Sequence, residues 1–186
     1  MTILTTKRLR LEPITDSHLE GLCKLNSDPL VMRYISGKAE TREETIAMIQ
    51  RVKDRWAELG YSWWSFIDVE NNEIIGAGCI QHLGRERANP LEIGWRLRVD
   101  KWGQGYASEA AQCMAAFAFD QLKAQTLCAI CMPENAASSH VMKKLGMSYQ
   151  GMERWHEKDT AVYSMSKETW EKTLASAYAA DLIDKN

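Results

Sequence analysis

The segment KWGQGYA, residues 101–107, places two glycines one residue apart between a strand-like and a helix-like stretch. Glycine lets a backbone approach a ligand closely, and the free amides at the start of a helix form an anion site together with the helix dipole. Gly103 and Gly105 therefore favour binding of a phosphate or pyrophosphate. A glycine-rich turn without a ligand explains the same residues equally well.

Two better-known phosphate loops do not fit this segment. The mononucleotide loop ends in Gly-Lys-Ser/Thr, whereas here Gly105 is followed by Tyr106 and Ala107. The dinucleotide fingerprint requires glycine or alanine where Ser108 stands, and it follows the opening strand of a domain. The glycines of this loop therefore belong to neither the mononucleotide nor the dinucleotide motif.

Glu92 is the candidate for acid–base chemistry. In LEIGWRLRV, residues 91–99, apolar and polar positions alternate, which predicts a strand with one buried and one solvated face. Glu92 lies on the polar face of this strand, which leads into the glycine loop. A carboxylate there could take a proton from an amine, directly or through water. A solvated carboxylate, or an ion pair with Arg96, accounts for Glu92 equally well.

No metal site is predicted. The five cysteines are scattered through apolar segments, which is typical of reduced thiols. Cys128 and Cys131 have C-x-x-C spacing, but they fall in a strand-like run, where residues three apart point to opposite faces. The sequence has no second pair and no histidine at ligand spacing. None of the cysteines lies in a recognisable nucleophile setting either.

The composition is that of one ordinary globular domain. A chain of 186 residues, 45% hydrophobic and 26% charged, can bury a sizeable core. A formal net charge of -2 provides no basic field for nucleic acid. The chain begins without the apolar core of a signal peptide, and no apolar run approaches the roughly 20 residues that span a bilayer. We therefore expect a cytoplasmic protein without a nucleic-acid or membrane partner.

Strand and helix patterns alternate along the chain, and Thr41 and Glu44, at capping-box spacing, open the clearest helix, which Gly60 ends. Together the patterns predict a mixed α/β layered sheet in a single domain, residues 1–186. Strands are predicted at 8–14, 63–70, 73–83, 91–99, 126–132, 147–155 and 159–166. Helices are predicted from Asp16 or Ser17 to about Asn26, at 42–59, after the glycine loop, at 135–145, and in a C-terminal tail at about 167–183.

Four blocks run through the chain in the order TKRLRLEPI, SDPLVMRYI, LEIGWRLRVDKWGQGYASEA and NAASSHVMKKLGM. Together they resemble the GNAT superfamily of acyl-CoA-dependent N-acyltransferases, and within it the ribosomal-protein N-terminal acetyltransferase-like (RimJ/RimL-type) subfamily. The resemblance covers nearly the whole chain. It implies a GNAT fold, in which a mostly antiparallel, twisted central sheet of about seven strands, flanked by helices, splays around the cofactor cleft.

The resemblance also implies that the glycine loop binds acetyl-CoA. Backbone amides of the loop would hold the pyrophosphate of coenzyme A, and the pantetheine arm would pair with the preceding strand. Trp102 stands where the family often carries Gln or Arg, so its amide rather than its side chain is expected to bind. Asn135 matches a family position on the cofactor arm and is also a good helix cap, and we favour both roles for it. The implied cofactor-binding residues are Leu97, Arg98, Val99, Trp102, Gly103, Gln104, Gly105, Tyr106, Ala107, Asn135 and Ser138.

For the chemistry, Glu92 is the expected base, and backbone amides near Leu97 could stabilise the oxyanion. The tyrosine that many GNAT enzymes use as general acid is replaced here by Met142, which has no proton to donate. Ser138 is the nearest match to the serine of the subfamily, with Ser139 next, so Ser138 is the expected proton relay. Glu109, in the first turn of the helix after the loop, is expected to be structural.

The sequence thus predicts an acetyl-CoA-dependent N-acetyltransferase that acts by direct attack of a primary amine, as a monomer or homodimer. The amine would belong to a protein N-terminus or to a small molecule, and Tyr34 is expected to line its site. Glu153, Glu157 and Asp159 either attract a cationic amine or lie in solvent. Two alternatives stay open: a non-catalytic acyl-CoA-binding or sensing module, which Met142 favours, and a nucleotide-binding enzyme.

Overall fold

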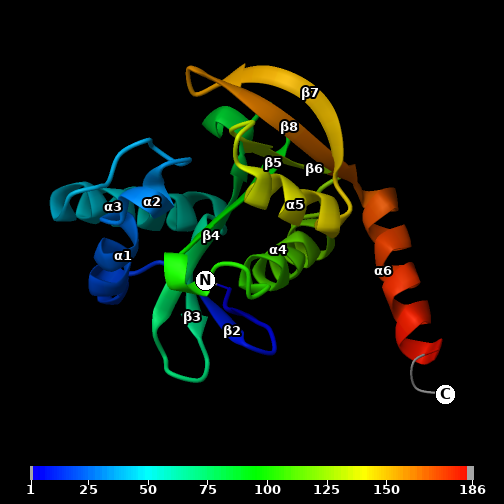
Figure 1. Ribbon diagram of the computed structural model, residues 1–186, viewed down its shortest axis with the longest axis horizontal. Helices are drawn as coiled ribbons and strands as arrows, with labels where there is room; N and C mark the ends of the chain where they lie inside the picture. The colour runs from blue at the N-terminus through cyan, green and yellow to red at the C-terminus, as the bar shows by residue number, and fades with distance from the viewer. Residues whose placement is uncertain (1, 184–186) are drawn as a thin grey trace.

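The computed structural model describes residues 2–183, which form a mixed α/β fold around one eight-stranded sheet (Figure 1). The strand order is β1-β2-β3-β4-β5-β6-β8-β7, and every neighbouring pair is antiparallel except β5 and β6. The strands are β1 Leu4–Thr5, β2 Leu9–Pro13, β3 Trp63–Asp68, β4 Ile74–His82, β5 Leu91–Leu97, β6 Thr126–Cys131, β7 Ser148–Trp155 and β8 Lys158–Ser166.

The predicted fold class is confirmed; about seven strands were expected, and the sheet has eight, of which β1 has only two residues. β1 is too short to show alternation in the sequence, and it exists because Leu4 and Thr5 pair with Leu11 and Arg10 at the edge of the sheet.

Helices cover both faces of the sheet. Neighbouring residues of β3 point to opposite faces of the sheet. On one face, Ser65 Oγ lies 3.1 Å from Nδ1 of His18, in the turn before α1. On the other face, Trp64 packs edge-on against Phe117, which follows α4. Figure 1 shows α1, α2 and α3 grouped on one side, and α4 and α5 on the other. The helices are α1 Leu19–Asn26, α2 Pro29–Met32, α3 Arg42–Leu59, α4 Tyr106–Ala116, α5 Ala136–Leu145 and α6 Lys167–Ile183.

Helix α3 has the ends that its sequence predicts. Thr41 Oγ1 accepts from the Glu44 amide at 3.2 Å, and the Glu44 carboxylate accepts from the Thr41 amide at 2.8 Å. Gly60 ends the helix with φ +77°, in the left-handed region that glycine adopts readily. At α1 the predicted cap is wrong: Thr15 is the N-cap of a 3-10 turn, Asp16–His18, that leads into the helix, and His18 is the N-cap of α1 itself.

The sheet opens between β5 and β6. These two strands pair only at Leu91 with Leu127 and at Glu92 with Cys128. The other edge of β5 pairs with β4 along the whole of Leu91–Leu97, which keeps β5 extended beyond the point where β6 departs. From Ile93 to Leu97, one edge of β5 therefore faces a gap rather than a strand.

Helix α6 follows β8 and is held to the body of the protein by Trp170. Its indole is buried and stacks on Phe119 with ring centroids 5.7 Å apart. Within residues 2–183 no helix is long and apolar enough to cross a membrane.

Candidate active site

The glycine loop between β5 and α4 has a backbone that only glycine adopts easily. Gly103 and Gly105 have φ of +70° and +83°, and Gly105 is the N-cap of α4. Within the described residues, the amides of residues 103–107 donate to no carbonyl or side chain. Five unpaired amides at a helix N-terminus fit the negative charge of a pyrophosphate.

The N-terminal hairpin holds this loop in place. Arg8 Nη1 donates to the Gln104 carbonyl at 3.0 Å, and Arg8 Nε donates to Glu109 at 2.7 Å. Glu109 also accepts from Thr6 Oγ1 at 2.6 Å and from the Arg8 amide at 2.9 Å. Partial burial raises the pKa of Glu109, but these hydrogen bonds outweigh it and hold the pKa below its usual value. Glu109 thus has a structural role, as its position in the first turn of the helix predicts. The contact of Arg8 with the loop could not be predicted from the sequence, because Arg8 lies 96 residues before Gln104.

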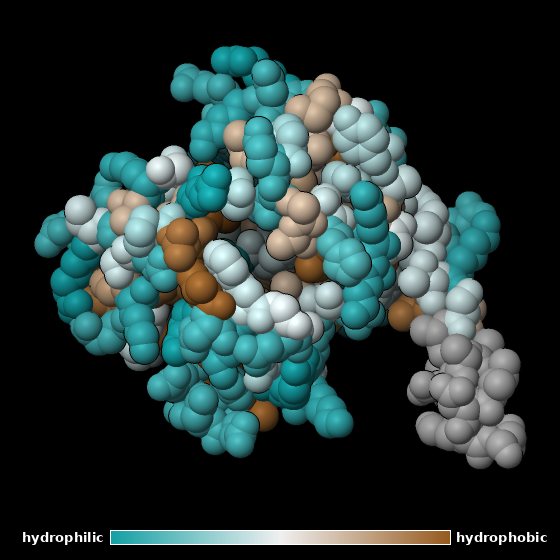
Figure 2. All heavy atoms as spheres, in the orientation of Figure 1, coloured by the Kyte–Doolittle hydropathy of each residue, from teal (hydrophilic) through white to brown (hydrophobic). Residues whose placement is uncertain are grey.

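A cleft of about 430 Å³ opens at this loop, between the end of β5 and the helices α4, α5 and α2. Its rim is apolar, because Leu30, Ile35 and Trp102 are large exposed side chains on it. Figure 2 shows a hollow near the centre of this face with hydrophobic atoms along its edge. We call it the cofactor cleft. Of the residues predicted from the sequence, it is lined by Tyr34, Leu97, Trp102, Gly103, Gly105, Tyr106, Ala107, Asn135 and Ser138.

Three of the predicted cofactor-binding residues do not line this cleft: Arg98, Val99 and Gln104. β5 ends at Leu97, two residues earlier than predicted, and Val99 begins a 3-10 turn. The Arg98 guanidinium bonds Asp100 and Glu73 instead, both at 2.8 Å. Gln104 Nε2 donates to the Asp100 carbonyl at 2.7 Å, so this residue reaches the site through its backbone only.

Helix α5 presents two polar residues to the cleft. Asn135 is the N-cap of α5, and its Oδ1 accepts from the Ser138 amide at 3.2 Å. Ser138 Oγ makes no hydrogen bond within the described part of the chain, whereas Ser139 Oγ donates to the Ala136 carbonyl at 3.0 Å. Of the two serines, Ser138 has the free hydroxyl.

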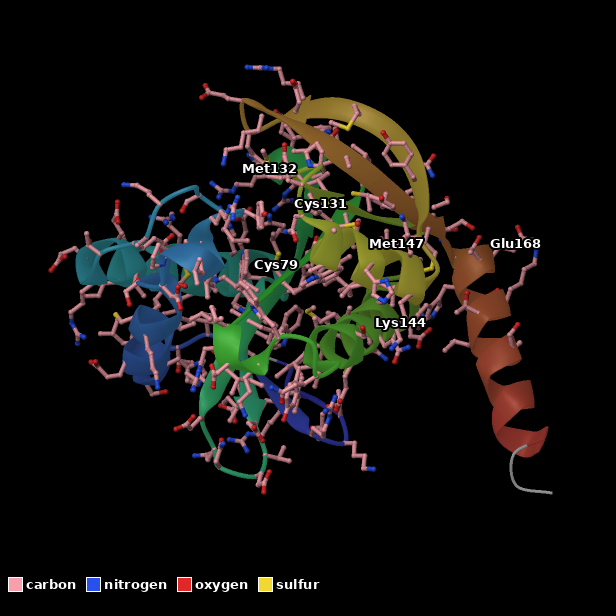
Figure 3. All side chains as sticks on the ribbon, in the orientation of Figure 1. Cys79, Cys131, Met132, Lys144, Met147 and Glu168 are labelled. Atoms are coloured by element: carbon pink, nitrogen blue, oxygen red, sulfur yellow. The ribbon has the colours of Figure 1, made fainter. Side chains whose placement is uncertain are left out.

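A second cleft, of about 460 Å³, lies on the α3 face of the sheet, and we call it the acceptor cleft. Its walls come from α3, β5, the end of β6 and the tip of the β7–β8 hairpin. Figure 3 labels Cys131 and Met132, which line it where β6 ends, and Lys144 on α5, which lines the cofactor cleft. The two clefts meet, because both are lined by Tyr34, Ile35, Trp95, Arg96, Asn135 and Ser138.

Glu92 lies in the acceptor cleft and is only 8% exposed. Its carboxylate accepts from Gln81 Nε2 at 3.1 Å, and it forms no ion pair with Arg96. Burial raises the pKa of Glu92, although the hydrogen bond from Gln81 opposes this. The predicted solvated face of β5 is therefore wrong in one respect: Glu92 and Arg96 share a face, but that face lines a cleft rather than bulk water.

The methionine and cysteine side chains at the site are buried and uncharged. Met142, in the position of the usual general acid, is buried and lines the acceptor cleft. Cys79 and Cys131 line the same cleft, and burial raises the pKa of both thiols. Cys128 lies nearby, and burial raises its pKa to about 12. A thiolate nucleophile is thus disfavoured. Among the residues described, no cluster of three or more His, Cys, Asp or Glu is arranged to hold a metal ion.

The free amides of the glycine loop, the open edge of β5 and the cleft between them form a site with room for an extended ligand that carries phosphate. The chain belongs to the Acetyltransferase (GNAT) domain family, which matches residues 8–148. It is thus an acetyl-CoA-dependent acetyltransferase.

Relatives and solved structures agree with this assignment. The chain is 30% identical to the Uncharacterized N-acetyltransferase YnaD of Bacillus subtilis (strain 168), over 90% of this chain and 98% of that protein. A GNAT-family acetyltransferase from Bacillus anthracis has a TM-score of 0.77 at 26% identity, covering 90% of this chain and 99% of the other. RimL, a ribosomal L7/L12 alpha-N-protein acetyltransferase solved with coenzyme A, has a TM-score of 0.76 at 19% identity, covering 89% and 98%, and so shares the fold.

Proposed function

We propose that this protein is an N-acetyltransferase that moves an acetyl group from acetyl-CoA to a primary amine by direct attack. One observation carries the proposal: a cleft with unpaired loop amides and a cleft with a buried carboxylate meet at Arg96 and Ser138. The first suits the donor, and the second suits an acceptor that must lose a proton.

The cofactor cleft would hold acetyl-CoA through the backbone. Amides of residues 103–107 would bind the pyrophosphate, and the open edge of β5 near Leu97 would pair with the amide groups of the pantetheine arm. Asn135 would contact the same arm while it caps α5. When bound, acetyl-CoA supplies an acetyl thioester whose carbonyl carbon accepts an amine.

Glu92 would act as the base. An alkyl amine is mostly protonated at neutral pH, and a carboxylate whose pKa is raised by burial is a better acceptor for its proton than an ordinary one. Glu92 lines the acceptor cleft only, so it would work through water that reaches the junction of the two clefts. Gln81 orients its carboxylate.

Ser138 would serve as the proton relay in place of the missing tyrosine. Its hydroxyl is free and lies at the junction of the clefts, whereas Met142 offers no proton. Direct transfer is favoured because the thiols that line the acceptor cleft are held protonated by burial.

The four sequence blocks and the shared fold with RimL support a ribosomal-protein acetyltransferase-like subfamily for this chain. In that group the acceptor would be a protein N-terminal amine or the amine of a small molecule. Tyr34, which lines both clefts, would contact it.

A thermal-shift and turnover panel tests the proposal. Coenzyme A should raise the Tm, whereas ATP and NAD should not, and acetyl-CoA with a suitable amine should release free thiol. Binding of coenzyme A without turnover over peptides and small amines would favour the sensing module instead. A shift with ATP or NAD alone would favour a nucleotide-binding enzyme.

A further inference from the structure

Arg96 is a buried cation that has no hydrogen-bonded or ion-pair partner among the described residues. Its residue is only 8% exposed, yet its Nε makes no hydrogen bond, and its guanidinium forms no ion pair within the described residues. The guanidinium lies over the Trp63 ring, with its Cζ 4.7 Å from the ring centroid, and Arg96 lines both clefts. Buried polar groups are nearly always paired in folded proteins, so donors left free beside a cleft indicate a missing acceptor.

The other cations of the acceptor cleft are also unpaired. Arg51, Arg55, Arg85 and Lys158 line it, and in the part of the chain that the structure describes none of them forms a salt bridge. This is not general for the protein, because salt bridges do join carboxylates to Arg8, Arg10, Arg42, Arg87, Arg98 and Arg154.

Little negative charge balances these cations. The acids of the cleft lining are Glu40 and Glu92, two carboxylates against the five cations Arg51, Arg55, Arg85, Arg96 and Lys158. Glu40 is the carboxylate whose charge acts on Arg96, but it accepts its hydrogen bond from Asn26 Nδ2, at 3.0 Å, and not from Arg96. Glu153, Glu157 and Asp159, which the sequence offered as attractors of a cationic amine, line neither cleft. The acceptor cleft therefore suits an anion and disfavours a polyamine.

The floor of the cleft leaves room for a ligand beside Arg96. Glu92, Gly94 and Arg96 share one face of β5, and Gly94 between them has no side chain. A Cβ at Gly94 would meet only Cys79 Sγ, at 3.3 Å. With a rise of about 3.3 Å per residue, the Cα atoms of Glu92 and Arg96 lie about 13 Å apart, so their side chains bracket a small space over Gly94.

We infer that the acceptor is a small amine that carries a carboxylate, such as an amino acid, and that the Arg96 guanidinium binds this carboxylate. A planar guanidinium matches a carboxylate with two parallel hydrogen bonds. Because Arg96 reaches the junction of the clefts, it would hold the amino group of an amino acid beside the cofactor cleft. A protein N-terminus has a neutral amide in place of this carboxylate. The inference rests on the proposed function, which leaves the acceptor open.

Matched amines test the inference by turnover. Each acceptor is offered as the amino acid, its methyl ester and the amine that lacks the carboxylate, for example phenylalanine, phenylalanine methyl ester and phenethylamine, drawn from a panel of side chains. We expect the best amino acid to exceed both of its analogues in kcat/KM by at least about 10-fold, the effect of one charge-assisted contact. Equal rates for the three members, or a peptide as the best acceptor, would overturn the inference.

Calorimetry with N-acetyl amino acids and their methyl esters provides a readout without turnover. The free acids should bind at least about 10-fold more tightly than the esters. If no amine is acetylated, the proposed function fails, and this comparison still decides the inference, since equal affinities would overturn it.

Variants assign the contact to Arg96. In Arg96→Gln the preference for acid over ester should be lost in both assays, through a rise in KM for the amino acid, with the ester affected much less. Arg87→Gln removes an exposed arginine that lines neither cleft and should keep the preference. If Arg96→Gln does not fold, Arg55→Gln should reduce the preference in part. Retention of the full preference in a folded Arg96→Gln would overturn the assignment.

Discussion

At the scale of single residues, Glu92, as the proposed base, should determine how the rate depends on pH. In wild-type protein kcat/KM should rise with pH as Glu92 loses its proton, with a midpoint above that of an ordinary glutamate, because burial raises its pKa. Glu92→Gln should lower kcat/KM by about 100-fold or more and remove this limb of the profile. A variant that kept both the rate and the limb would show that another group is the base.

The same substitution should stabilise the fold. Because the pKa of Glu92 is higher in the folded than in the unfolded state, its favourable contribution is complete below the unfolded pKa and is lost as pH rises through the folded pKa. Glu92→Gln should therefore have a higher Tm than wild type near about pH 8, and the difference should disappear near about pH 4. Glu86→Gln, at an exposed position, should change the Tm little at either pH. A lower Tm for Glu92→Gln at the higher pH would contradict this account.

Substitutions at Gly105 distinguish the effect of backbone strain from the effect of charge on coenzyme A binding. A side chain in the left-handed region costs about 1 kcal/mol, and a carboxylate there would also repel the pyrophosphate. Calorimetry should show coenzyme A affinity reduced by at least about 10-fold in Gly105→Asp and less in Gly105→Asn. Gly60→Asp places a similar backbone strain, at φ +77°, on a residue that lines neither cleft, and should lower the Tm without changing the affinity. Unchanged affinity in Gly105→Asp would remove the loop from the cofactor site.

Local patterns could predict some site residues and not others. Gly103 and Gly105 were recognisable because two glycines one residue apart, directly before a helix, are a local signal for a turn with free amides. Alternation also put Glu92 on the right face of β5. Its burial could not be predicted, because the helix that covers that face, α3, comes from residues more than 30 positions earlier. Arg8 and the free guanidinium of Arg96 were missed for the same reason: their roles depend on tertiary neighbours.

At the scale of elements, the β1–β2 hairpin supports the start of α4 through Glu109. Glu109→Gln should lower the free energy of unfolding at neutral pH by about 1 kcal/mol. This is less than a fully buried ion pair would contribute, because water screens the partly exposed Arg8. The pKa of Glu109 is depressed by folding, so its contribution is present above the unfolded pKa and is lost as pH falls through the folded one. Urea denaturation at neutral and acid pH measures both effects, and coenzyme A affinity should fall a few-fold as the loop loosens.

The control for this prediction is Glu43→Gln, in the first turn of α3. Glu43 complements a helix dipole as Glu109 does, but it makes no hydrogen bond to another element in the described residues. If the two substitutions cost the same, Glu109 would act through the dipole alone and not through the hairpin.

Elements with strong local signals were predictable, and short ones were not. Helix α3 carries its own capping box and C-cap glycine, and its range agrees with the predicted one. Strand β1 and helix α2, of two and four residues, are too short for a periodic pattern and form only against neighbours already in place. The early end of β5 at Leu97 likewise reflects the turn at Val99, which leads into the glycine loop.

At the scale of the whole molecule, the sheet consists of two antiparallel blocks, β1–β5 and β6–β8, which share only the short parallel contact of β5 with β6. A ligand arm paired to the free edge of β5 would bridge them. Hydrogen exchange at the residues of β5 beyond Glu92 should therefore slow when coenzyme A binds, whereas exchange in the pair β2–β3 should change little. Equal slowing of exchange in β5 and in the pair β2–β3, or no slowing in β5, would contradict the idea that the ligand bridges the two blocks.

The short contact between β5 and β6 would make the stability of this protein depend on its cosubstrate. A cosubstrate at about 100 times its Kd adds about 2.7 kcal/mol to the stability of the protein that binds it, and here that gain would fall on the joint between the halves. When acetyl-CoA is scarce, the edge of β5 would open locally more often and become accessible to proteases, while the hydrophobic core that runs through both blocks keeps them together. The lifetime of the enzyme, and not only its rate, would then follow the supply of its donor.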